Sequence, residues 1–271
     1  MNSLEKKMVE SLQDLKENHH VIGVKAEFEA EGTRLEEAMR LKEVVSKAGL
    51  DLTIKIGGCE ALKDLYEARV IGVSRIVAPM IESEYALKKF LAATNLAFPK
   101  EERKEVSFLI NVETIQGFNN FDEMIEIDEI GELDGIVLGR VDMTRSLGLP
   151  RTFENSDRIL QIAQTLVTKA KTKSLECCLG GGVSAETVDF MKKLPKGTLD
   201  KYETRKIIFK CPEALGEKAG IGILKAVGFE LMWLKNKRDF YGMIQAEDEQ
   251  RLSMMEERYH KLITNAGGVY K

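Results

Sequence analysis

Charged side chains on otherwise apolar segments are the residues of this sequence best suited to chemistry, because burying a charge is unfavourable unless it is paired or liganded. Glu113 lies near the end of the apolar segment 106–114, and Asp142 near the end of the segment 134–143. Two carboxylates on neighbouring strands suit a hard divalent cation, Mg2+ or Mn2+. Each carboxylate taken singly could also be structural, as a helix cap or a turn residue. We predict that Glu113 and Asp142 hold a catalytic divalent metal ion.

Strand parity brings further ionisable residues next to this pair, since alternate residues of a strand share a face. Lys25 and Glu27 share a face of the first predicted strand, and Lys55 lies on the second. Arg140 and Asp142 share a face of the fifth. Lys55, Glu27 and Arg140 are the predicted catalytic residues. Lys25 is a predicted substrate contact.

Three glycines are predicted to line the substrate site, namely Gly139, Gly181 and Gly182. Backbone N–H groups exposed at the start of a helix can bind an anion, and the run 180–182 precedes a predicted helix. The structural alternative for this run is a tight strand-to-helix turn. For Lys25 and Lys55, it is a buried stem with its ammonium group in water at a barrel end.

Short apolar strands alternate with helical segments along the chain, the pattern of consecutive βαβ units. The predicted strands are 21–30, 51–58, 75–83, 106–114, 134–143, 174–182, 204–210 and 229–237. A helix is predicted over 3–17 before the first strand, and another over 245–264 after the last. Eight units without a linker favour a (β/α)8 TIM barrel in the α/β class, as a single domain over residues 1–271. Active sites of this fold lie at the C-terminal ends of the strands, where the candidate residues converge.

Composition favours a small-molecule partner. The 271 residues are 44% hydrophobic and 31% charged, and the net charge of −4 is spread without a basic block, so no nucleic-acid partner is expected. The first twenty residues are too charged for a signal peptide, and the sequence has no apolar run of bilayer length. The four cysteines lack zinc-site spacing and are predicted to be reduced. We expect a cytoplasmic protein without a membrane partner.

Two segments carry a resemblance to a known family. INVETIQGFNNF (110–121) and DGIVLGRVDMTRSLG (134–148) resemble the fourth- and fifth-strand motifs of the HpcH/HpaI class II aldolase and citrate lyase β-subunit family, within the phosphoenolpyruvate/pyruvate-binding barrel superfamily. The resemblance extends over about residues 20–190. It implies that Glu113 and Asp142 are the family's metal-binding carboxylates, with Met143 in the usual Leu position. It also implies a 2-oxo acid substrate such as pyruvate and assembly as a homo-oligomer.

The sequence departs from the family pattern around this pair. Lys55 stands where the family's second strand usually has an Arg that contacts the enolate, so a point charge replaces a bidentate fork. Lys25 and Phe28 occupy the positions at which the aldolase branch has an acidic residue and a His for proton transfer, and Glu27 is retained. The three histidines all lie in terminal regions. These departures suggest a different proton transfer or a different reaction.

The leading hypothesis is metal-dependent carbon–carbon bond cleavage or formation next to a 2-oxo acid. A Schiff-base aldolase is one alternative, because four lysines lie on predicted strands: Lys25, Lys55, Lys210 and Lys235. A lyase acting on CoA thioesters, of the citrate or malyl-CoA type, is another alternative. The third is a degenerate barrel that binds a ligand without turnover.

Overall fold

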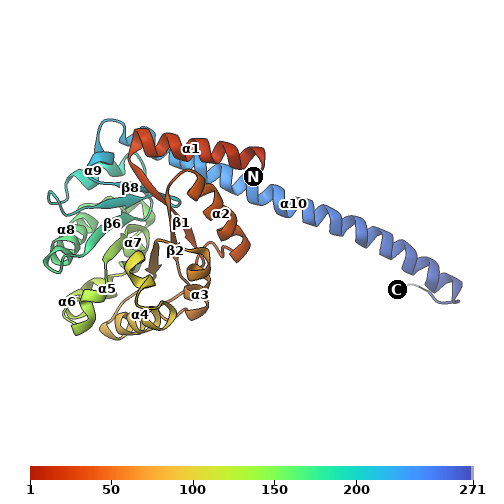
Figure 1. The fold of residues 1–271 in the computed structure, drawn as a ribbon, viewed down its shortest axis with the longest axis horizontal. Helices are drawn as coiled ribbons and strands as arrows, with labels where there is room; N and C mark the ends of the chain where they lie inside the picture. The colour runs from red at the N-terminus through yellow and green to blue at the C-terminus, as the bar shows by residue number, and fades with distance from the viewer. Residues whose placement is uncertain (270–271) are drawn as a thin grey trace. The chain divides into compact units, whose positions relative to one another are not determined.

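The structure, a computed structural model, describes residues 1–269 of the chain. The chain divides into two units, Met1–Glu230 and Leu231–Lys271. The first unit contains the eight strands that the structure describes, closed into a barrel in which the strands follow chain order (Figure 1). The second unit consists mainly of the C-terminal part of helix α10 (Ala219–Asn265), which begins in the first unit.

The barrel confirms the predicted α/β architecture. Its strands are β1 (Val21–Glu27), β2 (Asp51–Lys55), β3 (Arg75–Ala78), β4 (Ser107–Val112), β5 (Gly135–Gly139), β6 (Glu176–Gly180), β7 (Lys201–Glu203) and β8 (Ile207–Lys210). Strands β1 to β7 pair in parallel with their neighbours in sequence. Strand β8 closes the barrel between β7 and β1 and runs antiparallel to both.

Helices occupy most of the connections between strands in the first unit (Figure 1). The α-helices before α10 are α1 (Ser3–His19), α2 (Leu35–Lys47), α3 (Leu62–Ile71), α4 (Glu84–Ala97), α5 (Ile115–Asn119), α6 (Phe121–Ile125), α7 (Arg140–Ser146), α8 (Asp157–Thr172) and α9 (Thr187–Lys192). The described residues also form four 3-10 helices: η1 (Glu102–Glu105), η2 (Asp128–Glu132), η3 (Arg151–Phe153) and η4 (Glu213–Leu215). The leading helix confirms the prediction for 3–17.

Local sequence explains how α1 begins and which side it buries. The Asn2 side chain accepts a hydrogen bond from the Glu5 N–H, and the Glu5 carboxylate accepts one from the Asn2 N–H, which forms a capping box. Met8, Leu12 and Leu15 recur at helical spacing and are fully buried. This helix therefore covers apolar surface next to the first strand.

The end of the barrel differs from the prediction. The segment 229–237, predicted as the last strand, lies inside α10. Strand β7 lies wholly before the predicted strand 204–210, and β8 lies within it. Ile223, Ala226 and Phe229 are buried three residues apart, a helical period that the short apolar run concealed. Between β7 and β8 the chain makes a tight turn, in which the Thr204 N–H donates to the Ile207 carbonyl at 2.9 Å. The turn lies beyond the C-terminal end of β7, so the hairpin brings its own residues to the functional end of the barrel.

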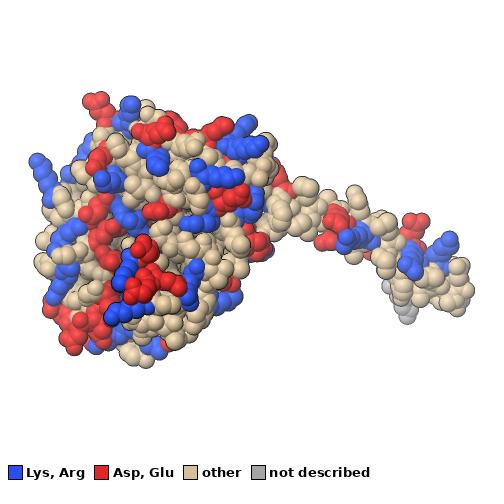
Figure 2. Space-filling model, viewed as in Figure 1, with Lys and Arg blue, Asp and Glu red and all other residues tan. Residues whose placement is uncertain are grey.

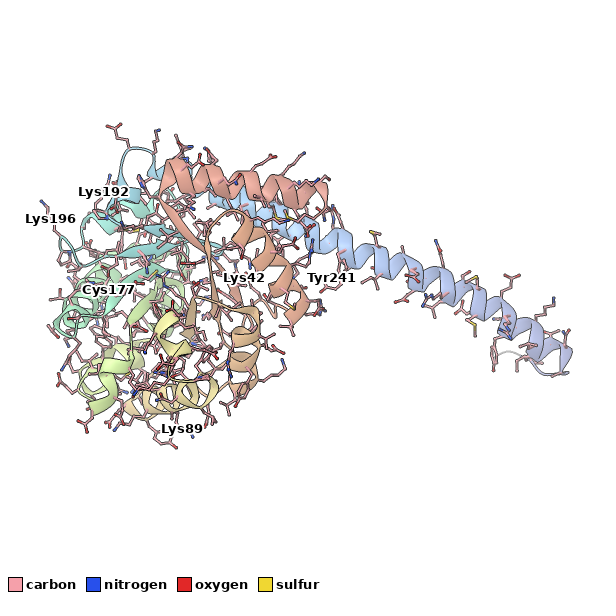
Figure 3. All side chains as sticks on the ribbon, viewed as in Figure 1. Lys42, Lys89, Cys177, Lys192, Lys196 and Tyr241 are labelled. Carbon is pink, nitrogen blue, oxygen red and sulfur yellow. The ribbon has the colours of Figure 1, made fainter. Side chains whose placement is uncertain are left out.

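A small hydrophobic cluster lies inside the barrel below its C-terminal end. It consists of Val77, Leu109, Val137 and Cys178, which are all buried. The preceding cysteine, Cys177 on β6 (labelled in Figure 3), packs outward, with its thiol 3.9 Å from the Val167 carbonyl of α8. Burial raises the pKa of the Cys177 thiol to about 12. The two adjacent cysteines thus face opposite sides of the strand and are free, as predicted.

The surface agrees with the charge pattern of the sequence. Figure 2 shows acidic and basic side chains interspersed over the visible face of the barrel. No helix among residues 1–269 has an apolar stretch long enough to cross a membrane.

Candidate active site

A cavity of about 500 Å³ opens at the C-terminal ends of the strands. Eight of the nine predicted site residues line it: Lys25, Glu27, Lys55, Glu113, Gly139, Asp142, Gly181 and Gly182. They come from β1, β2, β5, α7 and the loops that follow β4 and β6. Another cavity, of about 320 Å³, lies next to His19 and His20 before the start of β1, away from these residues.

Glu113 follows β4 directly and is almost completely buried. One carboxylate oxygen, Oε1, accepts a hydrogen bond from the Met80 N–H at 3.1 Å, and Oε2 accepts one from the Asn111 amide at 2.8 Å. Burial raises the pKa of Glu113, and the Lys55 ammonium group, 3.7 Å from Oε1, only partly opposes this effect. The carboxylate is therefore fixed in place but short of positive charge.

Gly139 makes room for Glu113. A Cβ atom at position 139 would lie 2.6 Å from Oε2 of Glu113, which is too close for any side chain. The prediction that Gly139 contributes to the site thus has a physical reason in the packing of the carboxylate. Gly181 and Gly182 have φ values of 76° and 68°, a backbone conformation that favours glycine. Their backbone is thus also consistent with the structural alternative, a tight strand-to-helix turn.

Asp142 reaches the cavity from a helix, since β5 ends at Gly139 and α7 begins at Arg140. The predicted strand over 134–143 was therefore too long, and strand parity was the wrong reason for linking Asp142 with Arg140. Both carboxylates nevertheless line the same cavity. The negative charge of Asp142 adds to the rise in the pKa of Glu113, after burial.

Arg140 is the predicted catalytic residue that the structure does not bring to the cavity. It is fully buried, and its guanidinium donates to the Gly181 carbonyl at 2.7 Å and to the Gly180 carbonyl at 3.3 Å. It also donates to the Asn155 side chain. Because α7 starts at this residue, its side chain turns away from that of Asp142 and into the protein. Arg140 thus positions the glycine-rich loop, and burial lowers its pKa to about 10.

Lys25 lies between two carboxylates at the β1 side of the cavity. Its Nζ is 2.5 Å from Oε1 of Glu203 and 3.3 Å from Oε1 of Glu27. Burial by itself would lower the pKa of Lys25, but Glu203 and Glu27 outweigh it and raise the pKa. Burial would raise the pKa of Glu27, but Lys25 and then Lys55 outweigh it and lower the pKa. Lys25 is thus an ammonium ion and Glu27 a carboxylate at neutral pH.

Lys55 occupies the centre of the charged group. Its Nζ lies 2.8 Å from Oε2 of Glu29 and 3.7 Å from Oε1 of Glu113. The register of β1 and β2 pairs Glu27 with Lys55, which explains why these charges meet. Burial disfavours the charged form of Lys55, but Glu113 and Glu29 outweigh it and raise its pKa. This lysine is therefore also protonated.

Several cavity residues were absent from the predicted site. Asn111 could have been found from parity, because it precedes Glu113 by two residues on one strand. Glu203 gave no signal, since it ends the three-residue strand β7 that the sequence pattern did not reveal. The same holds for Arg205 in the hairpin turn. Arg145 and Arg151 follow the predicted strand 134–143 and lie outside every segment predicted as a strand.

The donor set fits a divalent cation with two protein ligands. Glu113 and Asp142 offer carboxylate oxygens to the same cavity, and oxygen is the ligand that Mg2+ and Mn2+ prefer. A cation there would balance the burial and the like charge that raise the pKa of Glu113. Among residues 1–269 there is no group of three or more His, Cys, Asp or Glu side chains placed to bind a metal, so the remaining ligands would come from substrate and water.

Comparisons with known proteins agree with this architecture. The profile of the HpcH/HpaI aldolase/citrate lyase family matches residues 37–193. Citrate synthase SbnG has a similar structure, with a TM-score of 0.60 and 13% sequence identity over 86% of this chain and 90% of that chain. An HpcH/HpaI aldolase/citrate lyase family protein from Burkholderia cenocepacia J2315 has a TM-score of 0.57 and 12% identity over 93% of this chain and all of the other.

At such identities the two structures support the fold alone. No curated protein sequence matches the chain. The family profile, in contrast, covers more than half of the chain and includes both Glu113 and Asp142. The chain belongs to the HpcH/HpaI aldolase/citrate lyase family.

Proposed function

We propose that the protein cleaves or forms a carbon–carbon bond next to a 2-oxo acid, with a divalent cation, Mg2+ or Mn2+, held by Glu113 and Asp142. Family membership supports the class of aldolases and lyases. The observation that supports the metal site is that two carboxylates line one cavity, one of them buried and with a raised pKa. When bound there, the cation would supply Lewis acidity toward the oxo acid.

The residues of the chain divide the remaining work. Lys55, protonated and lining the cavity, places positive charge where the 2-oxo acid fragment accumulates negative charge. Glu27, ionised at neutral pH, is suited to accept a proton. In the cleavage direction it takes the proton of the hydroxyl on the carbon that becomes the aldehyde. The electron pair of the broken carbon–carbon bond passes to the 2-oxo acid fragment as an enolate, which regains a proton at carbon.

The Schiff-base alternative has less support. Lys25 and Lys55 are buried, paired with carboxylates and protonated, whereas a nucleophilic lysine must lose its proton. Lys210 is paired with Glu213 at 3.2 Å, and Lys235 lies in α10, so its predicted place on a strand was wrong. Borohydride reduction with pyruvate separates the two mechanisms, because only a Schiff base leaves a covalent adduct.

The test of the proposal is pyruvate release from 4-hydroxy-2-oxo acids in the presence of Mg2+ or Mn2+. We expect activity to disappear in EDTA, to return with added metal, and to be lost in Glu113→Gln. Glu123→Gln, an exposed carboxylate on α6, is the matched control and should keep full activity. Full activity of the wild-type protein in EDTA contradicts the metal assignment. Efficient turnover of a CoA thioester in place of the oxo acid would favour the thioester lyase. A protein that binds pyruvate without any turnover would favour the non-catalytic barrel.

The expected homo-oligomer and cytoplasmic location stay predictions. Apolar side chains of the second unit support self-association: Phe240, Met243, Leu252 and Met255 are each more than half exposed. Light scattering of the purified protein measures the mass directly, and a monomer at micromolar concentration contradicts the expectation.

A further inference from the structure

The cavity of about 320 Å³ next to His19 and His20 lies on the outer side of the β7–β8 hairpin. Each of the first six connections between strands contains a helix, whereas a tight turn joins β7 to β8, so the hairpin lacks a covering helix of its own. Helix α1, η4 and the start of α10 lie over it instead (Figure 1), and the cavity remains between them. We call it the hairpin cavity.

One side chain that borders the hairpin cavity lacks a hydrogen-bond partner. His19, the last residue of α1, is 5% exposed, and its Nδ1 is buried and makes no hydrogen bond within residues 1–269. Gly222 of α10 leaves room for the imidazole, since a Cβ atom there would lie 3.1 Å from Nδ1. Both residues line the cavity. A buried polar nitrogen without a partner is unfavourable, so a group from outside the chain is needed to complete it.

The start of α10 brings further donors to the same cavity. Glu217 and Lys218 line it, and in the described part of the chain neither backbone N–H donates to a carbonyl. The Lys218 side chain is exposed, and no carboxylate among residues 1–269 lies within ion-pair distance of it. Free N–H groups and the helix dipole make the N-terminus of a long helix favourable for an anion. The hairpin cavity thus combines this helix start with the unpartnered nitrogen of His19.

Two carboxylates also line the hairpin cavity, and they act differently. Glu213 is already neutralised by Lys210, at 3.2 Å. Glu217 is exposed and has no basic partner among the described residues, so its charge opposes the binding of an anion. Removing the charge of Glu217 therefore reveals the sign of the charge on a ligand.

We propose that the hairpin cavity binds a phosphate group, either free phosphate or a small phosphate monoester. Phosphate oxygens accept hydrogen bonds from the two backbone N–H groups and from the Lys218 ammonium group, and a further oxygen shares a proton with Nδ1 of His19. A carboxylate has only two oxygens for these four groups. The volume lies within the range of about 300–1000 Å³ of small-molecule sites, so an organic remainder also fits. The site is separate from the proposed reaction centre and does not rest on the proposed function.

The imidazole of His19 reports directly on an anion beside it. Burial lowers the pKa of His19, and the charges of Lys225 and Lys218 lower it further, against the opposing effect of Asp14. A bound phosphate adds negative charge next to Nδ1, so the pKa of His19 must rise on binding.

The experiment is NMR spectroscopy of the full chain with histidine labelled with 13C at Cε1, titrated in EDTA with inorganic phosphate or glycerol 3-phosphate. The chain has three histidines, and His260 near the end of α10 is the internal control. We expect a saturable movement of the His19 signal and a rise of its pKa by about one pH unit, with His260 unchanged. The probe that binds more tightly identifies the source of the phosphate group. Acetate should bind about tenfold more weakly, as the loss of one or two charge-assisted contacts predicts.

Surface variants connect the binding with the cavity and leave its buried residues in place. Lys218→Gln should weaken phosphate binding about fivefold, because one charge-assisted contact is lost. Glu217→Gln should tighten it about threefold, because a like charge is removed. Lys196→Gln, an exposed lysine outside the cavity (labelled in Figure 3), is the control and should keep the wild-type affinity.

Several results would overturn the proposal. A His19 signal that moves no more than that of His260 shows that phosphate does not bind there. Equal affinity for acetate overturns the assignment to phosphate, and weaker binding in Glu217→Gln indicates a cation in place of an anion. Phosphate binding that Glu113→Gln abolishes would assign the phosphate to the active-site cavity. None of these results bears on the proposed function, which pyruvate release tests separately.

Discussion

Two walls of the cavity use charge in different ways. On the wall formed by β1, β2 and β7, here called the paired wall, five ionisable residues neutralise one another: Lys25, Glu27, Glu29, Lys55 and Glu203. Their partners raise the pKa of the lysines and lower that of Glu27. The ion pairs of this wall therefore keep its lysines protonated and Glu27 ionised at neutral pH.

The wall formed by β4 and α7, here called the open wall, leaves charge for a ligand. Glu113 has a raised pKa because burial exceeds the help from Lys55, and Arg145 has no acidic partner among the described residues. Asp142 lines the cavity between them in sequence. Charged side chains that pair with one another stabilise the fold and shift each other's pKa values. Charged side chains without a full set of partners are the ones available to a ligand. Lys25 and Lys55, two of the departures from the family pattern, thus lie on the paired wall, and the two predicted metal ligands lie on the open wall.

The largest effect should come from the open wall. Asp142→Asn removes the charge of a proposed metal ligand, and we expect kcat/KM for pyruvate release to fall about 1000-fold. The free energy of unfolding should change by less than about 1 kcal/mol, because the side chain is only half-buried and lies on a short helix. Steady-state kinetics and urea unfolding measure the two effects. A variant that is strongly destabilised but active would make Asp142 a structural residue and remove the contrast between the walls.

A smaller effect is expected behind the open wall, at Arg140. Arg140→Gln leaves several buried carbonyl groups without their donor, and we expect a loss of about 3 kcal/mol in the free energy of unfolding, measured in urea. Arg158→Gln on the surface of α8 is the control and should be near neutral. If Arg140→Gln were fully stable and inactive, the catalytic role predicted from the sequence would be restored.

The smallest effect concerns the paired wall. Lys25→Met removes the main positive charge that keeps the pKa of Glu27 low, so that pKa must rise. The acidic limb of the pH profile of kcat/KM should move upward by about one pH unit, since Glu27 accepts a proton only when ionised. Lys47→Met, on the exposed side of α2, should leave the limb in place. An unmoved limb in Lys25→Met means that Glu27 is not the proton acceptor.

The same pKa directions fix how these pairs act on stability. Glu27 has a lowered pKa when folded, so its contribution is present above its unfolded pKa and is lost as the pH falls through the folded value. Lys25 has a raised pKa, so its contribution is present below its unfolded pKa and is lost only as the pH rises through the folded value. The paired wall is therefore stable throughout the neutral range.

Much of the fold could be predicted because its signals are local. Each of the first six strands is an apolar run bounded by turns and followed by a helical pattern, and all six were found. Strand β8 lies within the predicted strand 204–210, whereas β7 was missed and the strand predicted over 229–237 is helical. Strand β7 has three residues, too few for a pattern, and the apolar run 229–237 carries no periodicity that separates a strand from a buried helix. The single-domain organisation stays a prediction.

The sequence by itself determined which residues of the β4–α7 region could bind a metal, because acidic residues at the ends of apolar segments are costly wherever the chain places them. It determined likewise that Lys25, Glu27 and Lys55 share one end of the barrel, since strand parity is a local property. Only the tertiary structure decided that Arg140 turns inward and that Glu203 pairs with Lys25, a contact that spans 178 residues of the chain. Such pairings depend on how the barrel closes. The antiparallel direction of the last strand is determined by packing between segments that are distant in sequence, and the local sequence pattern does not predict it.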